Sequence, residues 1–599
     1  MNIREQIKKD ITEVISGQWS VVSESQVEIT RTADPKNGDY ATNVAMKLAK
    51  EAKQSRLEIA KKLADSLQKQ SYVEKVEVAD PGFVNIFVKD SVWQSEVEKV
   101  LSDEVRYGAN DAGKGKKARV EFVSANPTGP LHFGNARGGP IGDTLARVLE
   151  FSGWEVLREY IHNDVGEQVR KLGESILNVA KGAKLEDQEY KGEYIRELAS
   201  VILSNHSSHP ELDSGSRIQP STGFPIKSGM TDKTAQEVGK QATDLMLDET
   251  LADCEAMGIK FDKVYPESGF VTSGDTERAI AELDKKGFVK EKDGARWFAP
   301  NDEFLKDRET VVVKSDGSYT YFSNDIAYHK IKFTESYDLV VDVFGANHHG
   351  HVPRLQAVIK AFGFDVSRFH VILYQWVRFK KGGELVAMSK RSGNFVTAKE
   401  ILEMVGSDAV RFFILMHDPN SHIDFDLDLA REKSSKNPVF YVQYAHARIS
   451  SILAKASHPV ILGTTFSYHE RGTPESHLFV DSGLGQNDKK VNYELLTTNY
   501  ELELIKKISK LPELVEDISA NFGVNGLTTY AMELADSFHK FYENCRVLPE
   551  AQRDEKREKI KREEVTEEMT MARLGLLEAT RITLANTLKL LGISAPEKM

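Results

Sequence analysis

Residues 120–139 read VEFVSANPTGPLHFGNARGG, and this stretch decides the fold of the central part of the chain. An alternating strand runs into a turn rich in proline and glycine and then into the start of a helix. His132, Gly134 and Asn135 lie where the unpaired amides of a helix N-terminus bind anions. Gly134 lets a base or a phosphate approach the backbone, and the other two side chains offer hydrogen bonds. The stretch indicates a nucleotide site, with a glycine-rich turn in an α/β enzyme that binds no nucleotide as the alternative.

A second segment, residues 387–394 (AMSKRSGN), places two cations and two serines in a glycine-containing loop. Such a loop suits a lid that neutralises a transferring phosphate chain. Thr397 and Glu400 form the capping-box pattern of a helix over residues 397–405, which would anchor one side of the loop. A solvated basic loop is the alternative.

Together the two segments resemble the two signatures of class I aminoacyl-tRNA synthetases. The resemblance narrows to the arginyl-tRNA synthetase family and covers nearly the whole chain. Further segments carry it: 38–43 (GDYATN), 81–85 (PGFVN), 325–329 (DIAYH), 345–351 (GANHHGH), 437–448 (NPVFYVQYAHAR) and 590–596 (LLGISAP).

The chain departs from the family pattern at four positions. Asn135 stands where the first signature usually has a second histidine, so it can form hydrogen bonds but cannot carry a proton. Ala387 replaces the first lysine of many class I enzymes, which leaves the cationic role to Lys390. Asn324 and Asn347 replace the usual basic and acidic residues of the two middle segments.

The resemblance implies that the chain activates L-arginine with ATP, forming arginyl-adenylate and pyrophosphate, and then transfers arginine to the 3′ end of tRNA(Arg). This chemistry needs alignment and charge neutralisation more than a covalent nucleophile. We therefore expect His132, Asn135 and Lys390 to be the catalytic residues. Mg²⁺ is expected to accompany ATP, and no carboxylate set marks a dedicated metal cage. The expected ATP-binding residues are Ala125, Pro127, Thr128, Gly129, Pro130, Leu131, Phe133, Gly134, Gly345, His348, Met388 and Ser389.

For the amino acid, the resemblance carries Asn126 to its α-amino end and Tyr321 and Asp325 to its guanidinium end. The chemistry agrees, because the planar donor fork of a guanidinium pairs with a carboxylate held in a fixed plane. Glu121 is a candidate second carboxylate, and a surface residue on an edge strand is its alternative reading.

Aromatic and amide side chains at two places are candidates for tRNA binding. Tyr441, Gln443 and Tyr444 could stack on and hydrogen-bond anticodon bases, although the tyrosines would suit a helix core equally well. Tyr40 and Asn43 are candidates for contact with the tRNA elbow.

The histidines of the segment 345–351 have two interpretations. His348, His349 and His351 resemble a metal-ligand cluster, but a zinc site would need a fourth partner that the sequence does not supply. We favour a binding loop near the adenosine and expect no metal site.

We expect three domains. Residues 1–108 combine helices with short alternating runs at 73–78 and 83–88 and predict a small α+β module that contacts tRNA. Residues 109–435 alternate strands and helices, and the apolar runs 119–123, 339–344 and 371–377 predict a doubly wound, Rossmann-like parallel sheet with insertions and with ligands at its carboxyl edge. Residues 436–599 predict an all-α anticodon-binding bundle, with apolar stripes along 530–545 and 577–591. The polar segment 205–228 is expected to be a surface insertion or a disordered loop, and a similar segment, 457–492, interrupts the C-terminal domain.

Composition narrows the class of protein. The chain has 599 residues, a net charge of −12, and two cysteines, Cys254 and Cys545, far apart in sequence. The negative charge argues against indiscriminate coating of nucleic acid but leaves room for a local basic face. No apolar run is long enough for a bilayer and no disulfide framework is indicated, so we expect a cytoplasmic monomer that does not bind membranes. Two other function classes stay open, a catalytically inactive tRNA-binding relative and a small-molecule nucleotidyltransferase.

Overall fold

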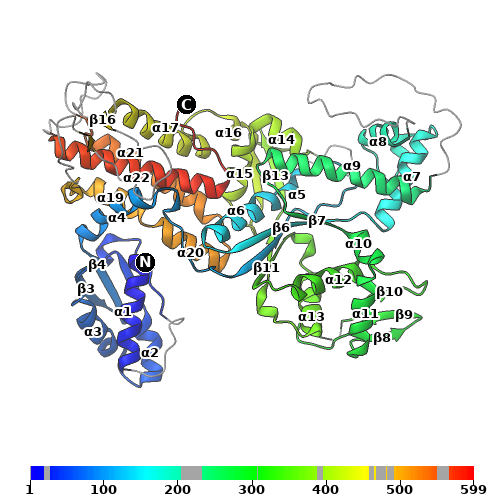
Figure 1. Ribbon diagram of the computed structural model, residues 1–599, viewed down its shortest axis with the longest axis horizontal. Helices are drawn as coiled ribbons and strands as arrows, with labels where there is room; N and C mark the ends of the chain where they lie inside the picture. Colours follow the sequence, from blue (N-terminus) through cyan, green and yellow to red (C-terminus); the bar gives the residue numbers. More distant parts are fainter. Residues whose placement is uncertain are drawn as a thin grey trace.

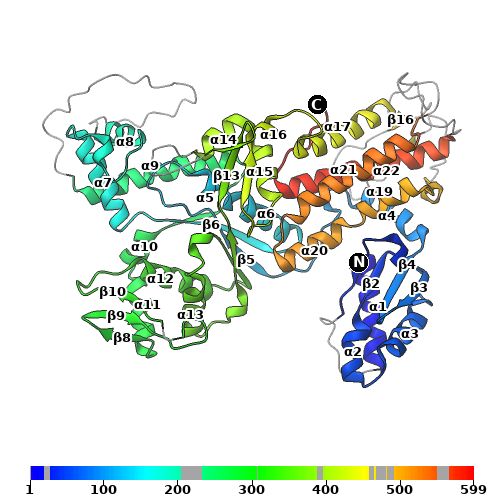
Figure 2. The same ribbon diagram turned by 180° about the vertical axis from the view of Figure 1, so that it is seen from behind.

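The computed structural model describes residues 2–18, 27–203, 233–306, 308–386, 396–456, 465–466, 480–481, 491–548 and 565–599. Three parts follow one another along the chain, as expected from the sequence (Figure 1). A small domain lies below a bundle of long helices, and the parallel sheet lies beside the bundle, in the middle of the molecule. The view from behind shows the same arrangement (Figure 2).

The N-terminal domain packs helices against one antiparallel sheet. Its strands follow the order β1-β2-β4-β3. The expected strand at 83–88 is β4, with those bounds, and the run at 73–78 is β3 with one more residue. The elements are α1 (Ile3–Gln18), β1 (Thr30–Arg31), β2 (Tyr40–Thr42), α2 (Val44–Ala52), α3 (Arg56–Leu67), β3 (Val73–Ala79), β4 (Phe83–Val88) and α4 (Asp90–Asp103).

The central domain is built on a five-stranded parallel sheet with the order β12-β11-β5-β6-β7. The chain enters the sheet at its middle strand, β5 (Lys117–Glu121), then adds β6 (Glu155–His162) and β7 (Lys263–Pro266) on one side. It adds β11 (Leu339–Gly345) and β12 (Phe369–Tyr374) on the other side. This is the doubly wound arrangement that the sequence predicts, and ligands bind such sheets where the order reverses, at the carboxyl end of β5.

β5 ends two residues earlier than the apolar run suggests. Val123 and Ser124 both have positive φ, 67° and 36°, and such a backbone cannot continue a strand. The chain therefore turns sharply after Phe122 and then enters α5 (Phe133–Ala136) and α6 (Gly138–Phe151).

Two insertions widen the carboxyl edge of the sheet. The first lies between β6 and β7 and contributes α7 (Glu167–Ala180), α8 (Tyr194–Leu203) and α9 (Ala235–Ala256). The second follows β7 and comprises α10 (Glu267–Thr272), α11 (Asp275–Lys285), β8 (Val289–Lys292), β9 (Ala295–Phe298) and β10 (Thr310–Val313), before α12 (Tyr321–Thr334). Figure 1 shows the two insertions on opposite sides of the carboxyl edge. η5 (Ala346–His348) and α13 (Val352–Phe362) join β11 to β12.

A smaller layer connects the sheet to the helical bundle. β13 (Val377–Lys381) pairs with β14 (Glu384–Val386) and with β15 (Ile423–Asp426). The predicted helix after the basic loop is α14 (Ala398–Val405), and its capping box between Thr397 and Glu400 is formed as expected. α15 (Ser407–Leu415) and α16 (Leu427–Arg431) complete the layer.

The C-terminal domain is helical, with the two expected apolar stripes inside. Tyr530, Leu534, Phe538 and Phe541 are fully buried, as are Leu577, Leu584, Leu588 and Leu591 on the last helix. Its elements are α17 (Pro438–Ala456), α19 (Asn499–Ile508), α20 (Leu511–Asn521), α21 (Gly526–Asn544) and α22 (Glu567–Leu591), with the short strands β16 (Thr465–Phe466) and β17 (Val480–Asp481).

A buried guanidinium ties this bundle to the central domain. Arg411 of α15 donates to the carbonyl oxygens of Leu591 (2.7 Å) and Met257 (3.0 Å) and to the Asp143 carboxylate on α6 (2.7 Å). Gly592 packs so closely on Arg411 that a Cβ there would lie 2.3 Å from a guanidinium nitrogen.

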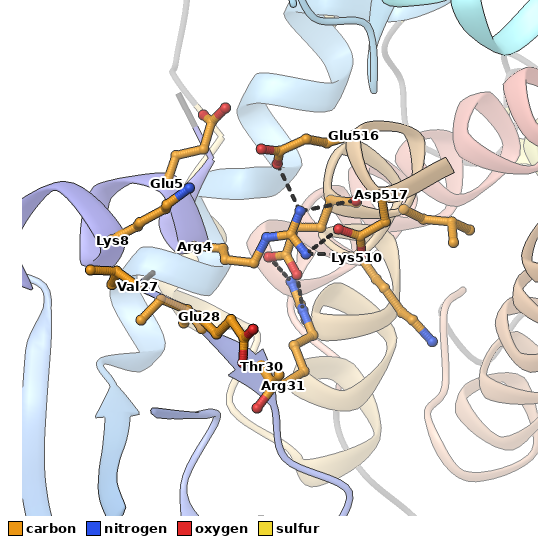
Figure 3. Close-up of a pocket in the computed structure, with 13 residues that line it drawn as sticks. Arg4, Glu5, Lys8, Val27, Glu28, Thr30, Arg31, Lys510, Glu516 and Asp517 are labelled. Carbon is orange, nitrogen blue, oxygen red and sulfur yellow. Dashed lines mark hydrogen bonds and ion pairs between the residues drawn. The ribbon is translucent and has the colours of Figure 1, made fainter. Parts of the chain in front are cut away.

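The N-terminal domain is fastened to α20 by charged side chains, which Figure 3 shows from close by. Arg31 donates two hydrogen bonds to the Glu513 carboxylate, at 2.8 and 2.9 Å. Arg4 donates to Glu516 (2.7 Å) and Asp517 (2.9 Å) beside it. These residues line a pocket of about 390 Å³ between the two domains.

Candidate active site

The turn after β5 is organised by its own histidine. The Nδ1 atom of His132 accepts a hydrogen bond from the Gly134 amide at 2.9 Å and so caps α5. Because Nδ1 accepts, the proton of the neutral imidazole lies on Nε2. A Cβ on Gly134 would lie 3.0 Å from that same Nδ1 atom. The glycine therefore keeps the capping geometry tight at the point where we expect a phosphate.

Buried groups fix the far side of this turn. Arg137 donates to the carbonyl oxygens of Gln375 (2.6 Å), Ser421 (2.8 Å) and Asp418 (3.0 Å), and burial lowers its pKa to about 10. The Tyr374 hydroxyl donates to the carbonyl oxygen of Asn135 at 3.2 Å. The start of α6 is thus held against the end of β12, next to the reversal of strand order.

The ends of the two sequence signatures meet. The Phe133 amide donates to the Val396 carbonyl oxygen (3.2 Å), and the Ala398 amide donates to the Leu131 carbonyl oxygen (2.8 Å). His132 and Thr397 form an antiparallel bridge between these bonds. Met388, Ser389 and Lys390 lie outside the described residues, but the chain that follows them starts beside His132.

Carboxylates gather at the carboxyl edge of the sheet. Asp325 and Tyr321 lie one turn apart at the start of α12, and the Asp325 carboxylate accepts from His351 Nε2 at 2.9 Å. Repulsion from Asp325 and then burial raise the pKa of Tyr321, and Glu267 and Glu121 act in the same direction. Negative charge from these three carboxyl groups therefore reaches the Tyr321 hydroxyl, and this part of the site favours a cation.

Glu121 is an interior residue. It ends β5, which lies between β11 and β6, and its side chain is 3% exposed. The alternative interpretation, a surface residue on an edge strand, is wrong because β5 is the central strand of the sheet. Asn126, in the loop after β5, is exposed.

Glu267 was not expected from the sequence. It opens α10 and accepts from the amides of Asn324 (2.8 Å) and Asn163 (3.0 Å), and burial raises its pKa to about 7. Asn324, one of the departures from the family pattern, also accepts from Thr276 at 2.9 Å. No local motif marks Glu267, because its partners come from the loop after β6 and from α12.

The histidine segment forms one wall of an open pocket. Tyr321, His348 and His351 line a cavity of about 620 Å³ next to α12. The His348 ring stacks on Phe344 with centroids 5.3 Å apart, and burial lowers the His348 pKa. Gly345 lies against the Asn347 side chain, where a Cβ would be 2.7 Å from Oδ1.

Another group in the described part of the chain has metal-ligand spacing: ligand atoms of His162, Asp164 and Asp244 lie within 4.8 Å of one another. Lys240 already pairs with Asp164 at 2.7 Å. The ammonium group of Lys240 supplies the positive charge there.

The candidate tRNA-binding residues have different surroundings. Tyr40 is fully buried and donates to Glu513 at 2.6 Å, so contact with RNA would require the domain interface to open. Gln443 donates to Asp408 (2.8 Å) and to Ser594, whereas Tyr444 is 43% exposed. Tyr441 packs its ring on His539, 4.9 Å between centroids. Asn43 precedes α2, and its side-chain oxygen is buried.

Three family models match successive parts of the chain. The model of the arginyl tRNA synthetase N terminal domain matches residues 1–88, and that of the class I (R) tRNA synthetase catalytic domain matches residues 96–423. The DALR anticodon binding domain model matches residues 442–599. An arginine–tRNA ligase of Geobacter sp. (strain M21) is 40% identical over 580 residues, covering 96% of this chain and 95% of the relative. The chain belongs to the arginyl-tRNA synthetase family.

A second relative and two solved structures match most or all of this chain. The arginine–tRNA ligase of Shouchella clausii is 36% identical, covering 100% of this chain and 99% of its own. A crystal structure described as a putative arginyl-tRNA synthetase from Campylobacter jejuni has a TM-score of 0.68 at 27% identity, over 86% of this chain and all of the other. The Thermus thermophilus arginyl-tRNA synthetase shares the fold, with a TM-score of 0.72 at 22% identity over the full length of both chains. Within the described residues, no helix is both long and apolar enough to cross a bilayer.

Proposed function

We propose that the protein is an arginine–tRNA ligase that forms arginyl-adenylate at the carboxyl edge of its parallel sheet and transfers arginine to tRNA(Arg). The observation that carries the proposal is the pair of acidic side chains at the carboxyl edge of the sheet, Asp325 one turn from Tyr321 on α12 and the buried Glu121 at the end of β5. A pocket of this charge fits the one common amino acid with a planar cationic side chain.

In this proposal the amino acid lies between α12 and the loop after β5. Asp325 pairs with the guanidinium, with Tyr321 beside it, while Glu121 supplies a second negative charge. Asn126 holds the α-amino end. The arginine carboxylate then points toward the turn that His132 caps, where it can attack the α-phosphate of ATP in line with the leaving pyrophosphate.

ATP enters as its magnesium complex and lies along the turn. Gly134 and Asn135 face the phosphates, His132 donates from Nε2, and the loop that carries Lys390 neutralises the leaving pyrophosphate. His348 and Gly345 border the adenosine. The remaining ATP contacts fall to the turn before α5 and to Met388 and Ser389.

The transfer step needs tRNA on the other two domains. We place the anticodon on the helical bundle near the exposed Tyr444, with Tyr441 and Gln443 on the same helix, and the elbow on the N-terminal domain near Asn43. We place both steps in the cytoplasm, in a monomer. The domain limits that fit this division are 1–108, 109–435 and 436–599.

ATP–pyrophosphate exchange with each of the twenty amino acids, with and without tRNA, tests the proposal. We expect exchange only when the amino acid supplied is arginine. Arginine-independent exchange, or exchange with a small acceptor other than an amino acid, would point to a small-molecule nucleotidyltransferase. Tight tRNA binding without exchange or charging would point to a catalytically inactive tRNA-binding relative.

A further inference from the structure

One lysine lies in the protein interior directly behind the candidate arginine site. Lys332 of α12 is 0% exposed, and its Nζ atom donates to Glu121 at 2.5 Å and to Asp342 at 2.6 Å. A third carboxylate, Glu159, lies 3.6 Å from the same nitrogen. A buried lysine destabilises the folded state unless its charge is paired. Here the paired carboxylates come from three strands of the sheet, β5, β6 and β11.

The three carboxylates differ in the cations that they meet. Glu159 also pairs with Arg119, and Asp342 also accepts from His329 Nε2 at 3.0 Å. For Glu121, Lys332 is the one cation within 4 Å among the described residues. Loss of the lysine charge would therefore affect Glu121 most.

Lys332 contacts one oxygen of Glu121, and that contact has three consequences. It holds this oxygen in place, and it leaves the other oxygen for a ligand at the end of β5. It also favours the ionised form of Glu121, because burial, the largest cause, raises the pKa of this carboxyl group and the Lys332 charge opposes that rise. A neutral Glu121 would give a cationic substrate little attraction.

We propose that Lys332 is a positioning residue for arginine recognition, which acts by orienting Glu121 and keeping it charged for the substrate cation. This inference rests on the proposed function, because that function supplies the arginine that Glu121 would bind. Lys332 itself does not touch the substrate.

Within the described part of the chain, the titratable groups that act on or near Glu121 come from four elements. They are Lys332, Tyr328 and Tyr321 of α12, Asp342 of β11, Glu159 and Tyr160 of β6, and Arg119 of β5. Without the lysine charge, the nearest groups left are the two other carboxylates, which oppose ionisation of Glu121.

The test replaces Lys332 by glutamine, which can still donate a hydrogen bond to Glu121 but carries no charge. We expect the arginine KM in tRNA charging to rise about tenfold or more at pH 7, because each unit by which the Glu121 pKa exceeds the assay pH removes a factor of ten from its ionised form. The ratio of variant to wild-type KM should fall as the pH rises to 9, while kcat at saturating arginine changes little. Expressing the result as a ratio removes the titration of free arginine.

Lys332→Arg keeps the charge, and its arginine KM provides the second test. Its KM can be raised by the larger side chain, but the ratio to wild type should stay constant with pH. Lys330→Gln is the matched control on the same helix, since Lys330 pairs with Glu282 and is partly exposed. Adding Glu121→Gln to Lys332→Gln should abolish the pH dependence.

The outcomes separate this inference from the proposed function. If the wild-type protein does not activate arginine, the function is wrong. If it does, and Lys332→Gln folds with an arginine KM ratio that is unchanged or independent of pH, the role of Lys332 is refuted. A pH-dependent ratio for Lys332→Arg would refute it as well, and that variant decides the matter if the glutamine variant does not fold.

Discussion

The backbone amide of Ala398 donates a 2.8 Å hydrogen bond to the carbonyl oxygen of Leu131. This bond joins the turn capped by His132 to the helix that follows the basic loop, two segments far apart in the sequence. The turn after β5 and the end of the basic loop are therefore joined, which supports a role for the loop at the phosphates of ATP.

We expect Lys390→Ala to lower the rate of arginine activation about 100-fold with little change in arginine affinity. The lysine charge matters mainly as pyrophosphate leaves, and one such contact is commonly worth about 3 kcal/mol. Single-turnover kinetics at saturating ATP measures this rate. The exposed Glu384 of β14 offers a control, Glu384→Gln. A near-normal rate for Lys390→Ala would remove the lysine from catalysis.

Glu267 should make the stability of the protein depend on pH. Burial, the largest cause, raises its pKa from 4.5 to about 7. The folded state therefore holds a proton that the unfolded chain has released, and the stability from this group is present below pH 4.5 and lost as the pH rises to 7. Glu267→Gln should remove up to about 3 kcal/mol of that decline. Denaturant unfolding at pH 5 and pH 8 checks it, and equal declines in both proteins would show that Glu267 does not titrate in this range.

Glu513→Gln should loosen the N-terminal domain from α20. Glu513 accepts from both Arg31 and Tyr40 and is 4% exposed, so the change removes the carboxylate partner of the Arg31 guanidinium, at about 1.5–3 kcal/mol. Limited proteolysis of the linker between α4 and β5 should become faster. Glu28→Gln, which breaks an exposed pair with Lys47, is the control and should have little effect. If the linker in the Glu513 variant is cleaved no faster than in the wild type, the other contacts are enough to hold the N-terminal domain on α20.

Gly592→Ala should destabilise the protein more than Gly363→Ala does. Both glycines end a helix with positive φ, 68° and 88°, so alanine strains the backbone by about 1 kcal/mol at either position. Only at Gly592 does the new Cβ meet the Arg411 guanidinium. The difference between the two free energies of unfolding isolates this clash, and no difference would mean that Arg411 moves aside freely.

Local patterns predicted most of the fold. The alternating run at 83–88, the capping box at Thr397 and the apolar stripe through Tyr530 each depend on neighbours in sequence, and each element formed as expected. The doubly wound class of the central sheet is confirmed, whereas its strand order was not predicted. The end of β5 was missed because the positive φ of Val123 and Ser124 has no sequence signal in non-glycine residues.

The site was harder to predict where residues meet only through the fold. Asp325 and Tyr321 were candidates because the family resemblance assigns them to the guanidinium, and their roles stay predictions. Glu267 and Lys332 were missed, since their partners come from other elements, the loop after β6 and α12 for Glu267 and three strands for Lys332. The one sequence signal for Lys332 is its position on the helix face that also carries the buried Tyr328 and His329.

The central claim is that the carboxylate of Asp325 selects arginine, and Asp325→Asn tests it most directly. The change keeps the shape of the side chain and its contact with His351 but removes the partner of the guanidinium, which costs about 2–5 kcal/mol in a desolvated pair. Glu277→Gln on the neighbouring helix α11, an exposed site, is the control. Arginine-dependent kcat/KM for activation should fall about 30-fold or more, while the KM for ATP stays near that of the wild type. Unchanged arginine kinetics would contradict the account.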